Sequence, residues 1–492
     1  MRIQKQVALK PYHLIILVFL ALFVSNLRAL SSFELHNIDK AHEQGYTGKG
    51  VNLGIIDGGF DTNHPYLAAN ILEVIKNSSY VGPNGDYKSH GTHVAGIIAA
   101  TKTNGSSYGI ASNSKFIGYG NVGMGISTPQ FNRMLDYGVK IINNSHNGNY
   151  PQLRHYAKNN DILIVYAAGN SNFFSPHSAA RHGTGSASNL GAWLVVGNLR
   201  QAAIKKDTSG QAVLGQGGSF GPSNMCIGSK AYCVVAAGTW IHSLNKNSSF
   251  TSKQGTSMAA PAVSGVAALV AEKYPFLGGK QLADVILGTA NKNFKVPKVF
   301  IWGAYVIYVD EPIPKKNNKN DDEKIRQDLT ALYGPNVGTR ANLDKVIFYT
   351  KEDIYGQGIV DAEAALKGLN LIDINRLGES DINVSNGTQI AFYTLDTKGY
   401  NALFENDIGQ RKWDKKYQNP TTQNLIGNKM SGLDAGLIKK GAGTLSISGN
   451  LNYLGDTIVE NGELRLLGKG GVIKARMMSE NSAQNVNPPP PS

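Results

Sequence analysis

Four polar residues of this chain have the types and order needed to cleave an acyl bond: Asp57, His90, Asn170 and Ser257. A serine hydroxyl is a poor nucleophile until a neighbouring base takes its proton, and histidine suits that task because its pKa lies near about 6.5. A buried carboxylate holds the imidazole in the required tautomer. The oxyanion then needs hydrogen-bond donors, which the Asn170 amide and the backbone N–H of Ser257 would supply.

Asp57 and Asn170 each follow an apolar run that predicts a buried strand. Residues 51–56 precede the aspartate, and residues 162–168 end shortly before the asparagine. Apolar runs of about four to eight residues bounded by glycine are typical of strands in a parallel sheet. Helix-like segments alternate with these runs, so we expect an α/β fold with a parallel sheet and helices on both faces.

His90 and Ser257 open segments that we expect to be helical, at residues 92–100 and 257–273. In an open α/β sheet the functional crevice lies beyond the carboxyl ends of the strands. The helices that follow such strands begin at the same edge. We therefore expect the two side chains to meet Asp57 and Asn170 there.

The segment around Ser257 is the most specific of these signals. It combines small residues with Pro261 in the first helical turn, where a missing N–H costs little. His64 and His93 are expected to be structural. The run from His90 to His93 has neither the spacing nor the third ligand of a zinc site, so no metal is predicted there.

These motifs together resemble those of the subtilisin-like (subtilase) serine proteases, over roughly residues 36–368. The matching segments are Gly54-Ile55-Ile56-Asp57-Gly58-Gly59, His90-Gly91-Thr92-His93-Val94-Ala95-Gly96, Ala167-Ala168-Gly169-Asn170 and Gly255-Thr256-Ser257-Met258-Ala259-Ala260-Pro261. The resemblance implies that Ser257 is the nucleophile and His90 the general base and acid. It implies that Asp57 orients the histidine and that Asn170 is the oxyanion donor. It also implies a peptidase domain over residues 30–368 and protein or peptide substrates. No cofactor is expected, and a structural calcium ion stays open.

The expected substrate-binding residues are Ser145, His146, Asn147 and Gly169. Residues 142–148 resemble the family's substrate-binding strand, but small or apolar residues commonly follow its serine. Here His146 and Asn147 stand in that place, which leaves the cleavage preference open. Few residues separate the expected leader peptide from the protease, so no inhibitory propeptide is expected.

The C-terminal part shows a different pattern. In residues 440–471 apolar and polar residues alternate between spaced glycines, which predicts short strands. This segment resembles the repeats of bacterial autotransporter passengers, which implies a β-helix-like rung. Residues 369–439 are expected to be a connector or irregular strands, and residues 472–492 a disordered tail. One rung is apparent and no strands of an outer-membrane barrel follow, so we expect a truncated or split autotransporter.

The N-terminus and the cysteines bear on localisation. Residues 1–29 have a basic start and a short apolar core, which predicts a signal peptide, with an uncleaved anchor as the alternative. We expect a secreted or cell-surface protein, or a periplasmic one if no translocator is supplied. Export favours a disulfide between Cys226 and Cys233, with two free buried thiols as the alternative.

Composition excludes several classes of protein. The formal net charge of +13 is spread along the chain, without a basic run interleaved with aromatic residues, so no nucleic acid is expected as a partner. Two cysteines are too few for a structural zinc site with three or four cysteine ligands. After the signal peptide no apolar run reaches about 18 residues, so no membrane contact is expected once the signal is removed. The oligomeric state cannot be read from the sequence.

The sequence therefore predicts a secreted serine endopeptidase that works through an acyl-enzyme. The alternative is an inactive passenger that acts as a surface or adhesive protein. The two hypotheses differ in the expected effect of Ser257→Ala. The substitution would abolish peptidase activity, but it would leave the surface binding of an inactive passenger unchanged. A lipase-type hydrolase is excluded by the triad order and by the absence of a Gly-x-Ser-x-Gly motif around Ser257.

Overall fold

The computed structural model describes residues 30–77, 81–82, 85–102, 109–120, 126–148, 150–181, 191–310, 319–338, 345–417, 427–468, 475–479 and 482–485. The predicted signal peptide lies outside these residues. The chain divides into two compact units. Of the described residues, one unit comprises those within Arg200–Ser219 and Asn293–Phe348, and the other comprises those within Ser32–Leu199, Phe220–Lys292 and Tyr349–Ser492.

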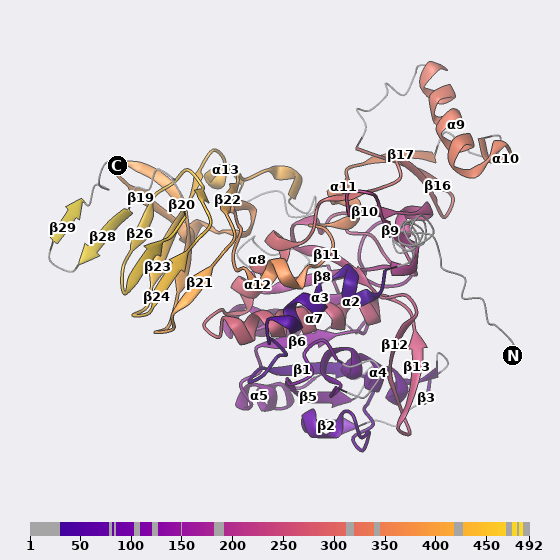
Figure 1. Cartoon of the computed structure of the whole chain (residues 1–492), viewed down its shortest axis with the longest axis horizontal. Coiled ribbons are helices and arrows are strands. Elements are labelled where there is room, and N and C mark those ends of the chain that lie inside the picture. Colours follow the sequence, from indigo (N-terminus) through magenta and orange to yellow (C-terminus); the bar gives the residue numbers. More distant parts are fainter. Residues whose placement is uncertain are drawn as a thin grey trace, which may run out of the picture. The chain divides into compact units, whose positions relative to one another are not determined.

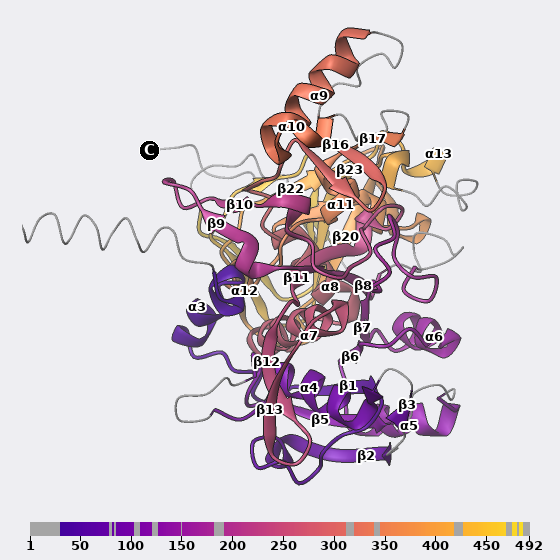
Figure 2. The same ribbon diagram turned by 90° about the vertical axis from the view of Figure 1, so that its right-hand side faces the viewer.

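A seven-stranded sheet forms the centre of the second unit, in the order β11-β8-β7-β6-β1-β5-β2 (Figure 2). Its strands are β1 (Asn52–Asp57), β2 (Ile71–Asn77), β5 (Lys115–Gly120), β6 (Ile141–Asn144), β7 (Leu163–Ala167), β8 (Trp193–Leu199) and β11 (Cys233–Ala237). Every neighbouring pair is parallel. All residues of β6, β7, β8 and β11 are buried, as expected for strands covered on both faces. The predicted α/β class with a large parallel sheet is confirmed.

Helices cover this sheet. The longer ones are α4 (Tyr87–Ala99), α5 (Thr128–Asp136), α6 (Pro151–Asn159), α7 (Thr256–Lys273) and α8 (Gly279–Thr289). The shorter ones are α2 (Ser32–Leu35), α3 (Ile38–Glu43), α11 (Lys351–Tyr355) and α12 (Ala362–Leu366). Helix α7 packs on β6, β7, β8 and β11, and α4 packs on α7, β1 and β5. Because α7 is apolar nearly all round, it lies buried at the centre of the unit.

Two hairpins belong to the same unit. Strands β12 (Ile241–Asn245) and β13 (Ser249–Lys253) pair antiparallel, and β12 packs on α4. Strands β3 (Val81–Gly82) and β4 (Gly85–Asp86) pair antiparallel just before α4.

The C-terminal part of this unit is a parallel β-helix (Figure 1). One of its sheets joins β19 (Ile382–Ser385), β20 (Thr388–Asp396), β23 (Asp434–Lys440), β26 (Thr457–Val459), β28 (Ala475–Ser479) and β29 (Ser482–Asn485). A second contains β21 (Ala402–Phe404), β24 (Thr444–Ile447) and β27 (Glu463–Leu466), and a third contains β18 (Leu371–Asp373), β22 (Ile408–Arg411) and β25 (Leu451–Asn452). The short helix α13 (Gly427–Met430) precedes β23.

The β-helix bears on two predictions. Strands β20, β21 and β22 form a first turn on which β23, β24 and β25 stack. Residues 369–439, for which the sequence predicted a connector or irregular strands, therefore contain a regular rung. The predicted disordered tail contains the paired strands β28 and β29. The rest of residues 472–492 lies outside the described residues. Buried side chains from successive turns form the inner stack, namely Ile390, Phe392, Ile438 and Ile458.

The first unit has its own small core. Its strands are β9 (Ile204–Lys206), β10 (Ala212–Leu214), β14 (Phe294–Lys295), β15 (Val299–Trp302), β16 (Tyr305–Val309) and β17 (Val346–Tyr349). Its helices are α9 (Lys319–Tyr333) and α10 (Pro335–Gly338). Ile325 and Leu329 of α9 pack on Val299, Val306 and Tyr308 of the β15–β16 hairpin.

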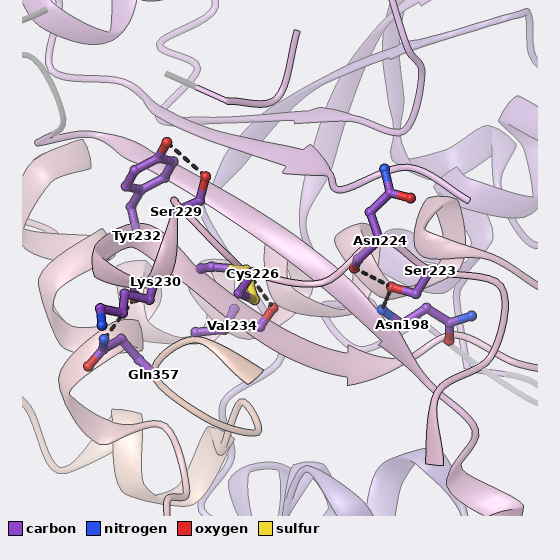
Figure 3. The surroundings of a disulfide bond; sticks show 10 residues. Asn198, Ser223, Asn224, Cys226, Ser229, Lys230, Tyr232, Val234 and Gln357 are labelled. Carbon is purple, nitrogen blue, oxygen red and sulfur yellow. Dashed lines mark hydrogen bonds between the residues drawn. A yellow bond between two sulfur atoms is a disulfide. The ribbon is translucent and has the colours of Figure 1, made fainter. Parts of the chain in front are cut away.

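Cys226 and Cys233 form a disulfide, which decides between the two alternatives left open by the sequence (Figure 3). Among the described residues, no helix combines the length and apolar character needed to cross a membrane.

Candidate active site

Asp57 and His90 form the first half of the site. Asp57 ends β1, and its side chain is only 1% exposed. His90 Nδ1 lies 2.8 Å from Asp57 Oδ1, which also accepts the Gly58 N–H at 2.7 Å. The His90 side chain keeps 30% of its surface exposed, so solvent or a substrate can reach the ring. Helix α4 begins at Tyr87, five residues before the predicted start, so His90 lies within its first turn.

Gly91 allows α4 to approach β1 this closely. A Cβ atom at Gly91 would lie 2.1 Å from the carbonyl oxygen of Gly59 and 3.2 Å from Asp57 Cβ. Any side chain at this position would therefore push the helix away from the strand. The distance between His90 and Asp57 depends on the absence of that side chain.

Ser257 is the second residue of α7. Its Oγ donates to the carbonyl oxygen of Ser145 at 3.0 Å, and Ser145 Oγ donates to the carbonyl oxygen of Ser257 at 2.9 Å. These two bonds join the start of α7 to the end of β6. Both Ser257 and His90 are described, and no hydrogen bond links them in this conformation. Catalytic hydrogen bonds are often long in ligand-free sites and tighten when a substrate binds.

Asn170 is oriented by Thr256, the residue before the predicted nucleophile Ser257. Asn170 Oδ1 accepts the backbone N–H and the hydroxyl of Thr256, each at 2.8 Å. With Oδ1 held on α7, Nδ2 lies on the other side of the planar amide, and within the described part of the chain it has no acceptor. Gly255 has a φ of +134°, and a Cβ there would lie 3.0 Å from Nδ2. The glycine therefore keeps the space around this donor open.

Thr256 holds the predicted oxyanion donor in place, and it is not among the site residues predicted from the sequence. The Thr256 hydroxyl also accepts the backbone N–H of Gly169 at 3.1 Å. It thus connects the start of α7 to the segment after β7 that carries Asn170. The signal in the sequence was its position between a glycine and the nucleophilic serine.

The predicted substrate-binding residues Ser145, His146 and Asn147 follow β6 directly. Strand β6 pairs with β1, so this segment lies beside the strand that ends in Asp57. Ser145 is buried, His146 is partly buried and Asn147 is exposed. The Gly169 N–H donates to the hydroxyl of Thr256, the residue before Ser257. The structure therefore brings this group to the same edge of the sheet.

His146 is held in place by its own segment. Its N–H donates to Asn144 Oδ1 at 3.1 Å, and its Nδ1 accepts the Gly148 N–H at 2.9 Å. Burial lowers the pKa of His146, and the charge of Asp57 partly opposes that shift. The ring is therefore neutral at neutral pH.

His93 and His64 make contacts of a structural kind. His93 Nε2 lies 2.9 Å from the carbonyl oxygen of Ile241 and 3.2 Å from that of Thr251, on the two strands of the β12–β13 hairpin. Burial lowers the pKa of His93 to about 3. His64 is fully buried, with Nε2 3.2 Å from the carbonyl oxygen of Ser249. Within the described residues, no group of three or more His, Cys, Asp or Glu side chains could hold a metal ion.

A parallel α/β sheet with an aspartate at a strand end, a histidine in one helix and a serine at the start of another is the arrangement of a serine hydrolase. Residues 48–317 match the Subtilase family (Peptidase_S8), and the chain belongs to this family.

Two curated relatives show how far the similarity extends. The chain is 29% identical over 307 residues to Subtilisin DY of Bacillus licheniformis, covering 55% of this chain and 94% of that protein. It is 25% identical over 535 residues to an extracellular serine protease of Serratia marcescens, covering 90% of this chain and 43% of that protein. The chain thus spans less than half of the Serratia protein. A solved cold adapted subtilisin-like serine proteinase is 25% identical, with a TM-score of 0.37 over 51% of this chain and 85% of that chain.

Proposed function

We propose that this protein is a serine endopeptidase that hydrolyses protein or peptide substrates through an acyl-enzyme on Ser257. The observation that carries this proposal is the hydrogen bond of 2.8 Å between His90 and the buried Asp57, formed at the sheet edge where α7 presents Ser257. The subtilase family consists of serine proteases, and its named relatives are subtilisins and an extracellular serine protease.

The reaction begins when the Ser257 hydroxyl turns from the Ser145 carbonyl to His90. His90 Nε2 takes the proton while Oγ attacks the scissile carbonyl, and the Asp57 carboxylate stabilises the imidazolium that forms. Asn170 Nδ2 and the Ser257 N–H donate to the oxyanion; one such donor typically contributes roughly 10²–10³ in turnover.

The intermediate collapses when His90 returns the proton to the leaving amine. The acyl group then remains as an ester on Ser257. A water molecule gives a proton to His90 and attacks this ester, which releases the acid and restores the serine hydroxyl.

Ser145, His146, Asn147 and Gly169 are proposed to contact the substrate backbone and the side chain before the scissile bond. Because His146 is neutral, it would offer a hydrogen bond and not a positive charge. Secretion or surface display is proposed from the predicted leader, the disulfide and the relatives named above. The alternative of an inactive adhesive passenger is less well supported, because all four candidate residues are present and His90 is bonded to Asp57.

A fluorophosphonate probe tests this function without knowledge of the substrate, because it reacts only with an activated serine. We expect the full chain to be labelled, and labelling and hydrolysis of a dye-labelled unfolded protein to be lost in Ser257→Ala. Ser252→Ala is the matched control, since Ser252 is exposed on β13. Equal labelling of Ser257→Ala, or no labelling of folded wild-type protein, would sink the proposal.

A further inference from the structure

The segment after β7 that carries Asn170 is attached to a second segment of the chain. We call residues 168–174 the oxyanion loop and residues 223–227 the clamp segment. Backbone N–H groups of the clamp donate to carbonyl oxygens of the loop: Asn224 to Gly169 at 2.7 Å, Met225 to Phe173 at 2.9 Å and Ile227 to Phe174 at 3.2 Å. The two segments therefore run side by side.

The Asn224 side chain makes the closest connection between them. It is fully buried, and its Oδ1 accepts the N–H groups of Ser171 at 3.1 Å and Phe173 at 3.0 Å. Its Nδ2 donates to the carbonyl oxygen of Ala168 at 3.0 Å. One amide thus bonds to the oxyanion loop on both sides of Asn170.

Gly169 shows how tight this packing is. Its φ is +103°, and a Cβ there would lie 2.6 Å from Asn224 Nδ2. The residue before Asn170 is therefore seated directly on the Asn224 amide. A shift of Asn224 would be transmitted to Asn170 through this contact.

The clamp segment is itself anchored at both ends. Ser223 Oγ accepts the N–H of Asn198 in β8 at 2.9 Å and donates to the Asn224 carbonyl oxygen at 2.8 Å (Figure 3). At the other end, Cys226 is bonded to Cys233 in β11 through the disulfide. Both anchors lie on neighbouring strands of the central sheet.

We propose that Asn224 is a positioning residue for the oxyanion donor Asn170, and that the Cys226–Cys233 disulfide holds the clamp segment in the place this requires. Neither group touches the substrate. The disulfide would thereby make full turnover depend on oxidation of the two cysteines. This inference rests on the proposed peptidase function.

The physical reason is that the oxyanion donor must lie close to its ideal position. An oxyanion donor is effective at about 2.7–3.1 Å from the developing charge. A misplacement of about 1 Å can cost about 10²-fold in rate. Such a loss falls on kcat, because the interaction is made mainly in the transition state.

A double-mutant cycle between Asn224→Ala and Asn170→Ala tests the inference. We expect Asn224→Ala to lower kcat on a peptide substrate about 10- to 100-fold, with KM little changed. In the Asn170→Ala background the same substitution should change kcat less than about twofold, because the group that it positions is already absent. An equal loss in both backgrounds, or no loss in the wild-type background, would overturn the proposal.

Asn70→Ala is the matched control. Asn70 is also a buried asparagine that donates to two backbone carbonyl oxygens, those of Ala99 and Ser112, away from the oxyanion loop. It should lower the melting temperature without the loss of kcat. If it lowers kcat as Asn224→Ala does, the effect on catalysis is general destabilisation and the inference fails.

The disulfide is tested by Cys226→Ala/Cys233→Ala in the same cycle with Asn170→Ala. This pair also replaces Asn224→Ala if that variant does not fold. We expect about a 3- to 30-fold loss of kcat in the wild-type background and little in the Asn170→Ala background. An equal loss of kcat in the two backgrounds would show that the disulfide does not act through Asn170, and this would refute its proposed role. Failure of the positioning role can be told apart from failure of the proposed peptidase function. A wild-type chain without Ser257-dependent activity would refute the peptidase function itself.

Discussion

His90 is bonded to only one oxygen of Asp57. Oδ1 lies 2.8 Å from His90 Nδ1, whereas Oδ2 is buried and has no hydrogen-bond partner among the described residues. An unsatisfied buried oxygen of a charged group is costly. It leaves much of the negative charge of the carboxylate unpaired beside the imidazole, where it can stabilise the imidazolium of the transition state.

Asp57→Asn should therefore lower kcat by about 10⁴-fold while the fold is retained, because an amide of the same shape favours the wrong tautomer of His90. The measurement is kcat on a peptide substrate together with the rate of fluorophosphonate labelling. Asp61→Asn is the control, since Asp61 lies a few residues away and its carboxylate accepts the backbone N–H groups of Asn63 and Ser248. An Asp57→Asn variant within about tenfold of wild type would contradict the assigned role.

Asn170→Asp separates the two tasks of the Asn170 amide. The aspartate can still accept from Thr256, as Oδ1 does now, but it replaces the Nδ2 donor by an oxygen. We expect kcat to fall at least about 10²–10³-fold with little change in KM. The melting temperature should stay close to that of the wild type. A rise in KM with unchanged kcat would show that Asn170 binds the substrate and not the oxyanion.

Gly91→Ala should reduce both activity and stability, although alanine is the better helix former by about 1 kcal/mol. The added Cβ would meet the Gly59 carbonyl oxygen at 2.1 Å and would move α4 away from Asp57. The measurements are the melting temperature and kcat. A variant that is more stable and equally active would show that α4 and β1 need not be this close.

His36→Gln should weaken the pH dependence of stability. His36 Nδ1 lies 2.9 Å from the Val360 carbonyl oxygen, and Nε2 accepts the Ala237 N–H at 2.9 Å. Burial lowers the pKa of His36 to about 4. Below about pH 6.5 His36 is protonated in the unfolded chain, whereas in the folded chain it stays neutral down to about pH 4. The free energy of unfolding therefore falls as the pH falls through this window.

Glutamine can make both bonds without titrating. The free energy of unfolding should therefore fall less in His36→Gln than in the wild type between pH 7 and pH 5. The difference between the two falls should be about 2 kcal/mol. Urea unfolding at the two pH values measures the difference. Buried His93 contributes a slope to both proteins and cancels in the comparison. Identical slopes would show that His36 does not stay neutral in the folded protein.

Lys439→Met should destabilise the β-helix. Lys439 is fully buried in β23, and its ammonium group donates to the carbonyl oxygens of Gly441, Gly443 and Asn461. Methionine fills a similar space but leaves these three carbonyl groups without the ammonium donor. We expect a loss of at least about 2 kcal/mol in the free energy of unfolding, measured with urea.

The neighbouring lysine provides the control for that experiment. Lys440 is 44% exposed and pairs with Glu460 at 2.9 Å on the surface. Lys440→Met should cost less than about 1 kcal/mol. Similar losses in the two variants would mean that the three bonds from Lys439 to carbonyl oxygens do not stabilise the protein more than a surface ion pair does.

The residues of the site could be read from the sequence because each belongs to a local pattern. Asp57 ends an apolar run, His90 lies in the first turn of a helix, and Ser257 opens a segment of small residues. The start of α4 lies five residues before the predicted start, directly after Asp86, which is a residue type common at helix N-caps. The first turn of the β-helix was missed because β21 and β22 are only three and four residues long, too short to show an alternation.

What the sequence by itself determined is the class of the fold, together with a set of candidate site residues, since apolar runs, caps and helical periods act over a few positions. Only the tertiary structure decided which distant segments meet. Ala402 pairs with Leu445, Asn224 bonds to the loop that carries Asn170, and Thr256 orients the Asn170 amide. Such partners are chosen by the packing of the whole sheet, because a hydrogen bond between segments far apart in the chain leaves no periodic mark in either one.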